Sequence, residues 1–259
     1  MKKTITFIIS FLILISFISK VPVLSKTALI DTELNWYFVP KSQGETPRFP
    51  DESSLFFYEN NCYSIGDTKN KVLYLTFDEG YENGNTSKIL DILKEVQVPA
   101  AFFVVNPYIT QEPDLIKRMV AEGHLVCNHS SHHISMATIT NNELFKKEFT
   151  EVEDAYLSVI GEEMPKFFRP PMGKYSKESL EKTKALGYKT IFWSFAYKDW
   201  LIDDQPEETK AKEKIKKGIH PGAIILLHAV SDTNAKILKE VLLDLKEEGY
   251  EFKSLNDLK

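Results

Sequence analysis

The stretch Leu73-Tyr74-Leu75-Thr76-Phe77-Asp78-Glu79-Gly80 decides how we interpret the chain. It begins as an apolar run of strand-forming residues, which predicts a buried strand, and it ends in two carboxylates and a glycine. Taken alone, Asp-Glu-Gly is ordinary turn punctuation after a strand. Four further strand-like runs downstream also end in polar residues. We therefore interpret the two acids as functional residues at the rim of a sheet.

Strand and helix patterns alternate from Lys71 to the end of the chain. Gly123, Gly187 and Gly249 each follow a helix pattern and suit the left-handed position that ends a helix before a strand. Such alternation predicts parallel strand pairing in the α/β class. About seven units favour a β/α barrel, with an open doubly wound sheet as the alternative, and both gather active groups at the carboxyl ends of strands. The predicted strands are 72–77, 100–105, 124–127, 166–168, 189–195, 223–227 and 250–253, and the predicted helices are 87–96, 114–122, 140–160, 176–186, 207–217 and 234–248.

Composition limits the partners and the compartment. The net charge of -5 and the pI near 5.8 argue against nucleic acid as a partner. Lys2 and Lys3 precede an apolar run over 5–18, which matches the charged and hydrophobic regions of an export signal and is short for a membrane span. We expect residues 1–25 to be a signal peptide, with an uncleaved membrane anchor through residues 5–19 as the alternative. The protein is then secreted or extracytoplasmic, in the cell wall or facing outward from the membrane.

The rest of the chain divides into two parts. Residues 26–67 carry aromatic residues and prolines without a period, which predicts an extended arm packed on a domain. Residues 68–259 form the domain itself. Cys62 and Cys127 do not make a disulfide framework, and the sequence leaves open whether they form one bridge. We expect a monomer.

Three predicted strand ends carry histidine or arginine. His129 and His133 are four residues apart, so a turn or tight loop would aim both imidazoles at one point, as a divalent metal with a carboxylate third ligand requires. Arg169 can hold a carboxylate, and the two prolines after it fix the backbone so that the Met172 amide is free to donate to an oxyanion. His228 ends an apolar strand. The alternatives are a polar loop for the histidine pair, a structural ion pair for Arg169, and a core histidine paired with Asp199 for His228.

Five ordered motifs together resemble a known family. They are Thr-Phe-Asp-Glu-Gly at 76, His-Ser-x-x-His at 129, Arg-Pro-Pro-x-Gly-x-Tyr at 169, Asp-Trp at 199 and Leu-Leu-His at 226. This order and spacing is similar to that of the NodB-type polysaccharide deacetylases, carbohydrate esterase family 4, over residues 71–259. The stretches at 76–84, 98–104 and 192–200 resemble more narrowly the delta-lactam-biosynthetic de-N-acetylases of spore cortex peptidoglycan.

The resemblance implies a distorted (β/α)7 barrel, the NodB homology domain, and a role for each motif. Asp78 would be the general base, oriented by Arg169, and His228 would be the general acid, tuned by Asp199. A divalent metal, zinc with cobalt or manganese as alternatives, would be held by two histidines and a carboxylate. Substrate would be bound at the strand ends. The implied metal ligands are His129, His133 and Glu79, and the implied substrate-binding residues are Met172, Tyr175, Trp200 and Leu226.

Glu79 departs from the family pattern, which has an aspartate as the metal ligand at this position. One extra methylene moves the carboxylate by about a bond length, whereas zinc–oxygen distances in proteins are confined to about 2.0–2.2 Å. Glu79 therefore either reaches the metal with a shifted backbone or leaves it to two histidines and water. Ile134 stands where the family usually has proline.

The resemblance implies a hydrolase that removes the N-acetyl group of muramic acid in the peptidoglycan glycan strand, with the stem peptide removed, on the route to the muramic lactam. One alternative is deacetylation of N-acetylglucosamine, chitin oligomers or acetylated xylan. An alternative of another class is a catalytically weak protein that binds cell-wall glycan and keeps the groove without the metal.

Overall fold

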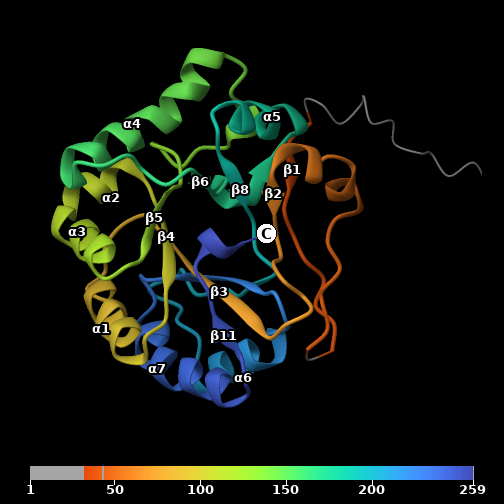
Figure 1. Ribbon diagram of the computed structural model, residues 1–259, viewed down its shortest axis with the longest axis vertical. Helices are drawn as coiled ribbons and strands as arrows, with labels where there is room; N and C mark the ends of the chain where they lie inside the picture. The colour runs from red at the N-terminus through yellow and green to blue at the C-terminus, as the bar shows by residue number, and fades with distance from the viewer. Residues whose placement is uncertain (1–31, 43, 259) are drawn as a thin grey trace, which may run out of the picture.

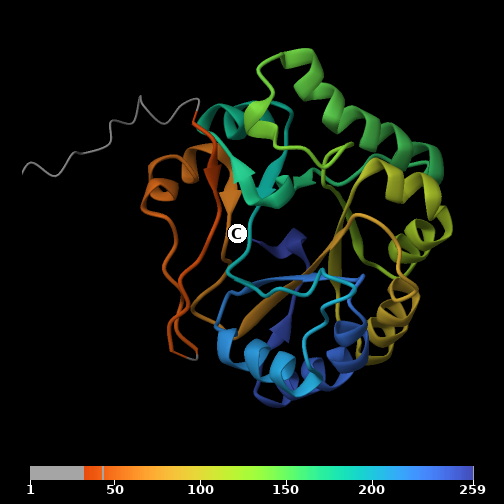
Figure 2. The ribbon, with the colours of Figure 1, turned by 180° about the vertical axis from the view of Figure 1, so that it is seen from behind.

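The computed structural model describes residues 32–42 and 44–258, and its centre is a curled parallel sheet surrounded by helices (Figures 1 and 2). Strand order in the sheet is β2-β8-β6-β5-β4-β3-β10-β9, with β11 beside the start of β3, and every pair is parallel. The expected α/β class with a distorted barrel is confirmed. Its strands are β2 (Cys62–Tyr63), β3 (Val72–Glu79), β4 (Ala100–Val104), β5 (Leu125–Asn128), β6 (Phe167–Phe168), β8 (Lys189–Ile191), β9 (Phe195–Ala196), β10 (Ile224–His228) and β11 (Glu251–Phe252).

Helices cover the outer face of this sheet. They are α1 (Thr86–Val96), α2 (Asn106–Gln111), α3 (Pro113–Ala121), α4 (Asn142–Ile160), α5 (Lys177–Ala185), α6 (Glu208–Gly218) and α7 (Asp232–Glu247). The longest helix, α4, is capped by the side chain of Asn141, not by the predicted Thr140, because Asn141 accepts hydrogen bonds from the backbone of Glu143 and Leu144. The predicted strand over 189–195 is two short strands. One of them, β8, pairs with β6 and β2, whereas β9 pairs with β10.

Strand β3 separates two layers of core. Leu73, Leu75 and Phe77 pack against the helices, whereas Val72 and Tyr74 face the interior of the barrel. Side chains alternate along a strand, so this register sends Asp78 inward and Glu79 outward toward the helical layer. Both residues are buried, but they lie in different surroundings.

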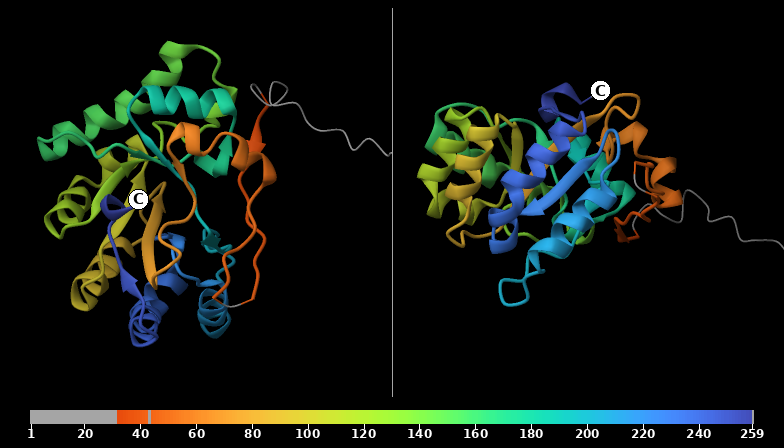
Figure 3. Two further views of the ribbon diagram at one scale, coloured as in Figure 1. Left: turned by 45° about the vertical axis from the view of Figure 1, so that its right-hand side comes forward. Right: turned by 90° about the horizontal axis from the view of Figure 1, so that it is seen from below.

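The two ends of the barrel are different. Leu255 and Leu258, near the C-terminus, pack with the inward residues at the start of β3 and so fill the end of the barrel where the strands begin. The loop after β9 projects at the opposite end, as the right-hand view of Figure 3 shows in light blue. The carboxyl ends of the strands therefore open on the face away from the C-terminus.

Residues 32–42 and 44–67 run along one side of the barrel, drawn in red and orange in Figure 1. Strand β1 (Leu34–Asn35) pairs antiparallel with β7 (Lys174–Tyr175). Trp36 stacks on Phe57 with ring centroids 5.2 Å apart, and Phe57 stacks on Phe192 at 5.0 Å. This aromatic packing fixes the described part of the arm to the barrel, and both Cys62 and Cys127 are free thiols.

The predicted signal peptide or anchor over 1–25 lies outside the described residues. Among the described helices, none is long and apolar enough to cross a membrane.

Candidate active site

Asp78 is held at the end of β3 by a buried arginine. Arg169, which follows β6, is fully buried, and its Nη1 donates to Asp78 Oδ1 at 2.7 Å. The guanidinium also donates to the carbonyl of Ile191 at 3.1 Å and lies over the Phe103 ring at 4.2 Å. Burial raises the pKa of Asp78, but the charges of Arg169 and the nearby histidines outweigh it and leave the pKa lowered. Asp78 is therefore an ionised carboxylate at neutral pH.

His129 and His133 lie next to this carboxylate, on the loop after β5. Their ring centroids are 4.9 Å apart, and His129 Nε2 is 3.6 Å from Asp78 Oδ2. The loop turns through left-handed backbone at Ser130 (φ 66°) and His133 (φ 54°), and Ser130 Oγ accepts from the His133 amide. The predicted histidine pair therefore converges on one point beside Asp78.

Helix α4 supports this loop from behind. Glu148 accepts hydrogen bonds from both the backbone amide and the ring Nδ1 of His132, at 2.9 and 2.8 Å. Ser131 Oγ donates to Glu151 at 2.6 Å. These contacts turn His132 away from the pocket toward α4, while the histidines on either side of it face Asp78.

His228 and Asp199 form a second charged pair at the end of β10. The Asp199 carboxylate only accepts, so the 2.7 Å contact makes His228 Nδ1 the donor and leaves Nε2 toward the pocket. Asp199 also accepts from the His228 backbone amide and from Asn234. Burial lowers the pKa of His228, but its hydrogen bond to Asp199 and the charges of Asp199 and Asp78 raise it by more. Its imidazolium is thus stabilised where a proton can be donated.

One open cavity of about 580 Å³ joins these groups. Three side chains on its rim, Tyr81, Met172 and Trp200, are about half exposed. Seven of the eleven predicted site residues line this cavity, and two more, Arg169 and Asp199, are hydrogen-bonded to Asp78 and His228. The cavity is lined by Asp78, Gly80, Tyr81, His129, His133, Met172, Gly173, Trp193, Trp200, Leu226, His228 and Val230.

Glu79 is not brought to this cavity. Its side chain is fully buried on the other face of β3, and neither carboxylate oxygen has a hydrogen-bond partner. Burial, followed by the charges of Glu82 and Asp78, raises the pKa of Glu79 well above its ordinary value. The predicted set of His129, His133 and Glu79 is therefore not assembled, and among the described residues no three acidic, histidine or cysteine side chains are arranged so that they alone could hold a metal ion.

Tyr175 also lies outside the cavity, although we expected it to bind substrate. It is fully buried, and its ring packs among Phe56, Phe57 and Phe192. Pairing of β7 with β1 turns it toward the arm. Its role in the Arg-Pro-Pro-x-Gly-x-Tyr motif is thus packing beneath the loop.

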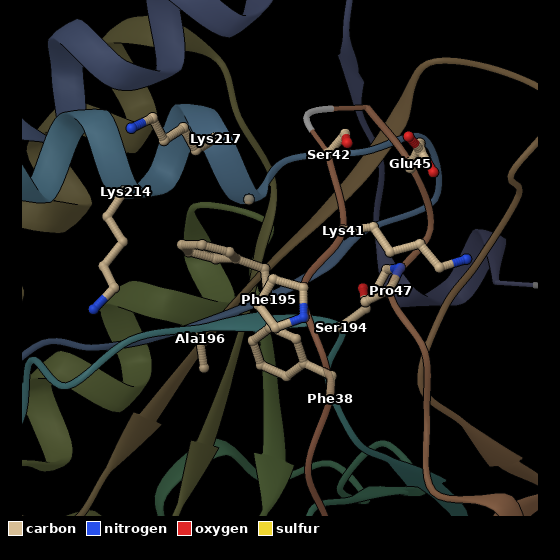
Figure 4. A pocket seen from close by; sticks show the side chains of 12 residues that line it. Phe38, Lys41, Ser42, Glu45, Pro47, Ser194, Phe195, Ala196, Lys214 and Lys217 are labelled. Carbon is tan, nitrogen blue, oxygen red and sulfur yellow. The ribbon is translucent and has the colours of Figure 1, made fainter.

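Five residues that line the cavity were not predicted as site residues: Gly80, Gly173, Val230 and the two aromatic residues Tyr81 and Trp193. The two aromatic residues belong to stretches that carried the resemblance, at 76–84 and 192–200, and their aromatic character next to motif residues was the available signal. A second cavity of about 280 Å³ lies between the arm and α6, around Phe38, Pro47 and Phe195 (Figure 4). It contains none of the predicted site residues.

The two imidazoles in the cavity are suited to a divalent metal. His129 Nδ1 donates to the carbonyl of Arg169 at 2.8 Å, which leaves the Nε2 lone pair free beside Asp78. Burial lowers the pKa of His129 to about 4 and also lowers that of His133, so both rings are neutral, as metal ligands must be. A carbonyl that fixes the tautomer of a ligating histidine is the usual outer-shell arrangement.

Comparisons with known proteins point to one family. The family model described as polysaccharide deacetylase matches residues 65–191, and this family is generally metal-dependent. The peptidoglycan-N-acetylmuramic acid deacetylase PdaA of Bacillus subtilis is 40% identical over 231 residues, which cover 89% of this chain and 88% of that protein. The solved structure of B. subtilis PdaA, a family 4 carbohydrate esterase, matches with a TM-score of 0.85 at 40% identity, covering 88% of this chain and 97% of that one.

A second solved structure gives the same result. It is a family 4 carbohydrate esterase from Bacillus anthracis, 42% identical, with a TM-score of 0.74 and coverage of 89% of this chain and 98% of that one. The likeness thus extends over most of both chains. The chain therefore belongs to the polysaccharide deacetylases of carbohydrate esterase family 4 and is a hydrolase of that family.

Proposed function

We propose that this hydrolase removes N-acetyl groups from peptidoglycan and that its target sugar is N-acetylmuramic acid. The observation that carries the proposal is the meeting of an ionised Asp78 and a protonatable His228 in one open cavity, each held by its own buried partner. The 40% identity to a peptidoglycan-N-acetylmuramic acid deacetylase, over nearly nine-tenths of both chains, favours this sugar. A secreted or wall-associated location follows from that substrate.

The residues support a simple hydrolytic sequence. Asp78 takes a proton from water as the water oxygen attacks the acetyl carbon. The Met172 amide donates a hydrogen bond to the resulting oxyanion. His228 Nε2 gives its proton to the sugar nitrogen as the carbon–nitrogen bond breaks. The products are acetate and a free amine on the sugar. Trp200 and Leu226 form apolar walls that fit the acetyl methyl group.

His129 and His133 would hold the metal in this proposal. A bound divalent ion supplies Lewis acidity, which polarises the amide carbonyl and lowers the pKa of water. Glu79 has no part in holding it, because its carboxylate lies on the helical side of β3 with its charge disfavoured by burial. We infer a site with two protein imidazoles beside Asp78 and open positions for water and substrate.

The metal ligands can be tested by metal content alone. His129→Ala is expected to lower the affinity for Zn²⁺ or Co²⁺ by at least about 10-fold, because one of only two neutral imidazoles is lost. Glu79→Gln is expected to leave the metal affinity within about twofold, since the amide has the same shape as a carboxyl group that does not face the cavity. Elemental analysis after equilibrium dialysis measures both. Loss of metal in Glu79→Gln would return Glu79 to the ligand set, and unchanged content in His129→Ala would remove His129 from it.

The target sugar can be tested on purified glycan strands, with and without stem peptides. We expect acetate release that depends on added zinc or cobalt, and we expect mass spectrometry of the digested strands to locate the acetyl loss on muramic acid. The Asp78→Asn protein serves as the blank. Acetyl loss confined to glucosamine would overturn the choice of sugar. Absence of acetate release under every metal condition would overturn the proposed function.

A further inference from the structure

We propose that the N-terminal arm is a working part of the active site, and that Glu33 is a positioning residue that clamps two of its loops together. The inference rests on the proposed function, since it gives the clamp a role in that reaction. Glu33 Oε2 accepts a hydrogen bond from Ser135 Oγ at 2.6 Å, and Oε1 accepts from Lys174 Nζ at 2.8 Å. One carboxylate thus joins two segments that are 102 and 141 residues away along the chain.

Both segments carry groups that face the active-site cavity. Ser135 lies two residues after His133, on the loop that carries the two imidazoles. Lys174 lies two residues after Met172, on the loop that follows Arg169. A change in the position of Glu33 therefore changes the spacing between the histidine loop and the Met172 loop.

The backbone of both loops needs such support. His133 has φ 54° and Met172 has φ 58°, so each is a non-glycine residue in the left-handed region. That region is disfavoured for residues with a side chain, and it persists only where surrounding contacts impose it. Glu33 provides one such contact within two residues of each strained position.

The residues after Glu33 fix the arm in place for this task. Leu34 and Asn35 pair with β7, directly beyond Met172. Trp36 donates its backbone amide to the Gly173 carbonyl at 2.8 Å and its indole Nε1 to the Trp193 carbonyl at 2.9 Å. A Cβ at Gly173 would lie 2.8 Å from the Trp193 ring and 3.2 Å from Trp36 Cβ, so the close approach depends on glycine. Residues 33–36 therefore contact three separate elements of the cavity.

Kinetics and hydrogen–deuterium exchange test the clamp together. Glu33→Ala is expected to lower kcat about 10-fold with KM within about twofold, because small misplacements of catalytic groups act mainly on the reacting geometry. Exchange is expected to become faster in both loops, 130–135 and 171–175. Glu33→Gln keeps a hydrogen bond to Ser135 but loses the charge that holds Lys174. Its kcat and its exchange rates should lie between those of the wild-type protein and those of Glu33→Ala. The matched control is Glu45→Ala, an arm carboxylate beside the second cavity (Figure 4), which should change neither measurement.

The outcomes separate the clamp from the proposed function. Wild-type kcat with unchanged exchange in Glu33→Ala overturns the clamp, as does an equal effect in Glu45→Ala. If Glu33→Ala fails to fold, Ser135→Ala and Lys174→Met each break one contact of the clamp from the other side, and each is expected to speed exchange in both loops. A wild-type protein that releases no acetate refutes the proposed function, while the exchange measurement still decides on the clamp.

Discussion

Replacement of Asp78 by asparagine is expected to lower kcat for acetate release by about 10²–10⁴-fold, the range that one general base contributes. The amide keeps the shape of the carboxylate but cannot accept the proton of the attacking water. Asp78 is suited to this role because Arg169 and the histidines lower its pKa and keep it ionised. Acetate released at saturating substrate measures kcat, and the unfolding transition must be recorded for the same preparation.

The stability measurement matters because Arg169 is fully buried. Removal of one partner from a buried ion pair costs about 3–5 kcal/mol, since the remaining charge is left without compensation. The asparagine oxygen can still accept from Arg169, and the carbonyl of Ile191 and the Phe103 face remain in contact with the guanidinium. We therefore expect a folded but less stable protein. Asp91→Asn, an exposed acid on α1, is the matched control. A folded Asp78→Asn protein with near wild-type kcat would exclude Asp78 as the base.

The fold could be predicted because its longer elements have strong periodicity. Strand β3 and helices such as α1 and α7 have apolar patterns that packing then reinforces, so their bounds agree with the sequence to within two residues. The division of 189–195 into β8 and β9 could not be predicted. An apolar run has the same pattern whether it forms one continuous strand or bends at Phe192-Trp193-Ser194 to form two strands with different neighbours. Tertiary pairing decides that, and no local signal reports it.

The site was predicted where a motif residue faces the barrel interior and was missed where it faces elsewhere. Asp78 and Glu79 are adjacent, and the sequence alone treats both as rim carboxylates. The structure continues the alternation of β3 through both residues and sends the second toward the helices. Tyr175 was misplaced for a similar reason, because its pairing partner Leu34 is 141 residues away. Contacts of the arm with the loops were also beyond sequence patterns, since they join segments that share no period.

His228→Gln is expected to lower kcat by about 10²–10⁴-fold, because the departing nitrogen loses the group that protonates it. In the wild-type protein the hydrogen bond and charge of Asp199, and then the charge of Asp78, raise the pKa of His228 against burial and the opposing charge of Arg169. His228 must be protonated to act as the acid, so kcat falls as pH rises through this raised pKa. The same fall should be absent from the residual activity of His228→Gln.

Asp199→Asn tests whether Asp199 raises the pKa of His228, because this variant keeps the imidazole itself. The asparagine removes the charge that favours the imidazolium, so the pKa of His228 falls and the alkaline limb of the pH–kcat profile moves to lower pH. The acidic limb, which reports protonation of Asp78, should stay in place because Asp199 does not contact that carboxylate. The asparagine keeps one oxygen in place of two, so either the His228 ring or the pair formed by Asn234 and the His228 backbone amide loses its acceptor, and the unfolding transition is recorded alongside. An alkaline limb that stays where it is in wild type, in a folded Asp199→Asn protein, would show that Asp199 does not set the proton affinity of the catalytic acid.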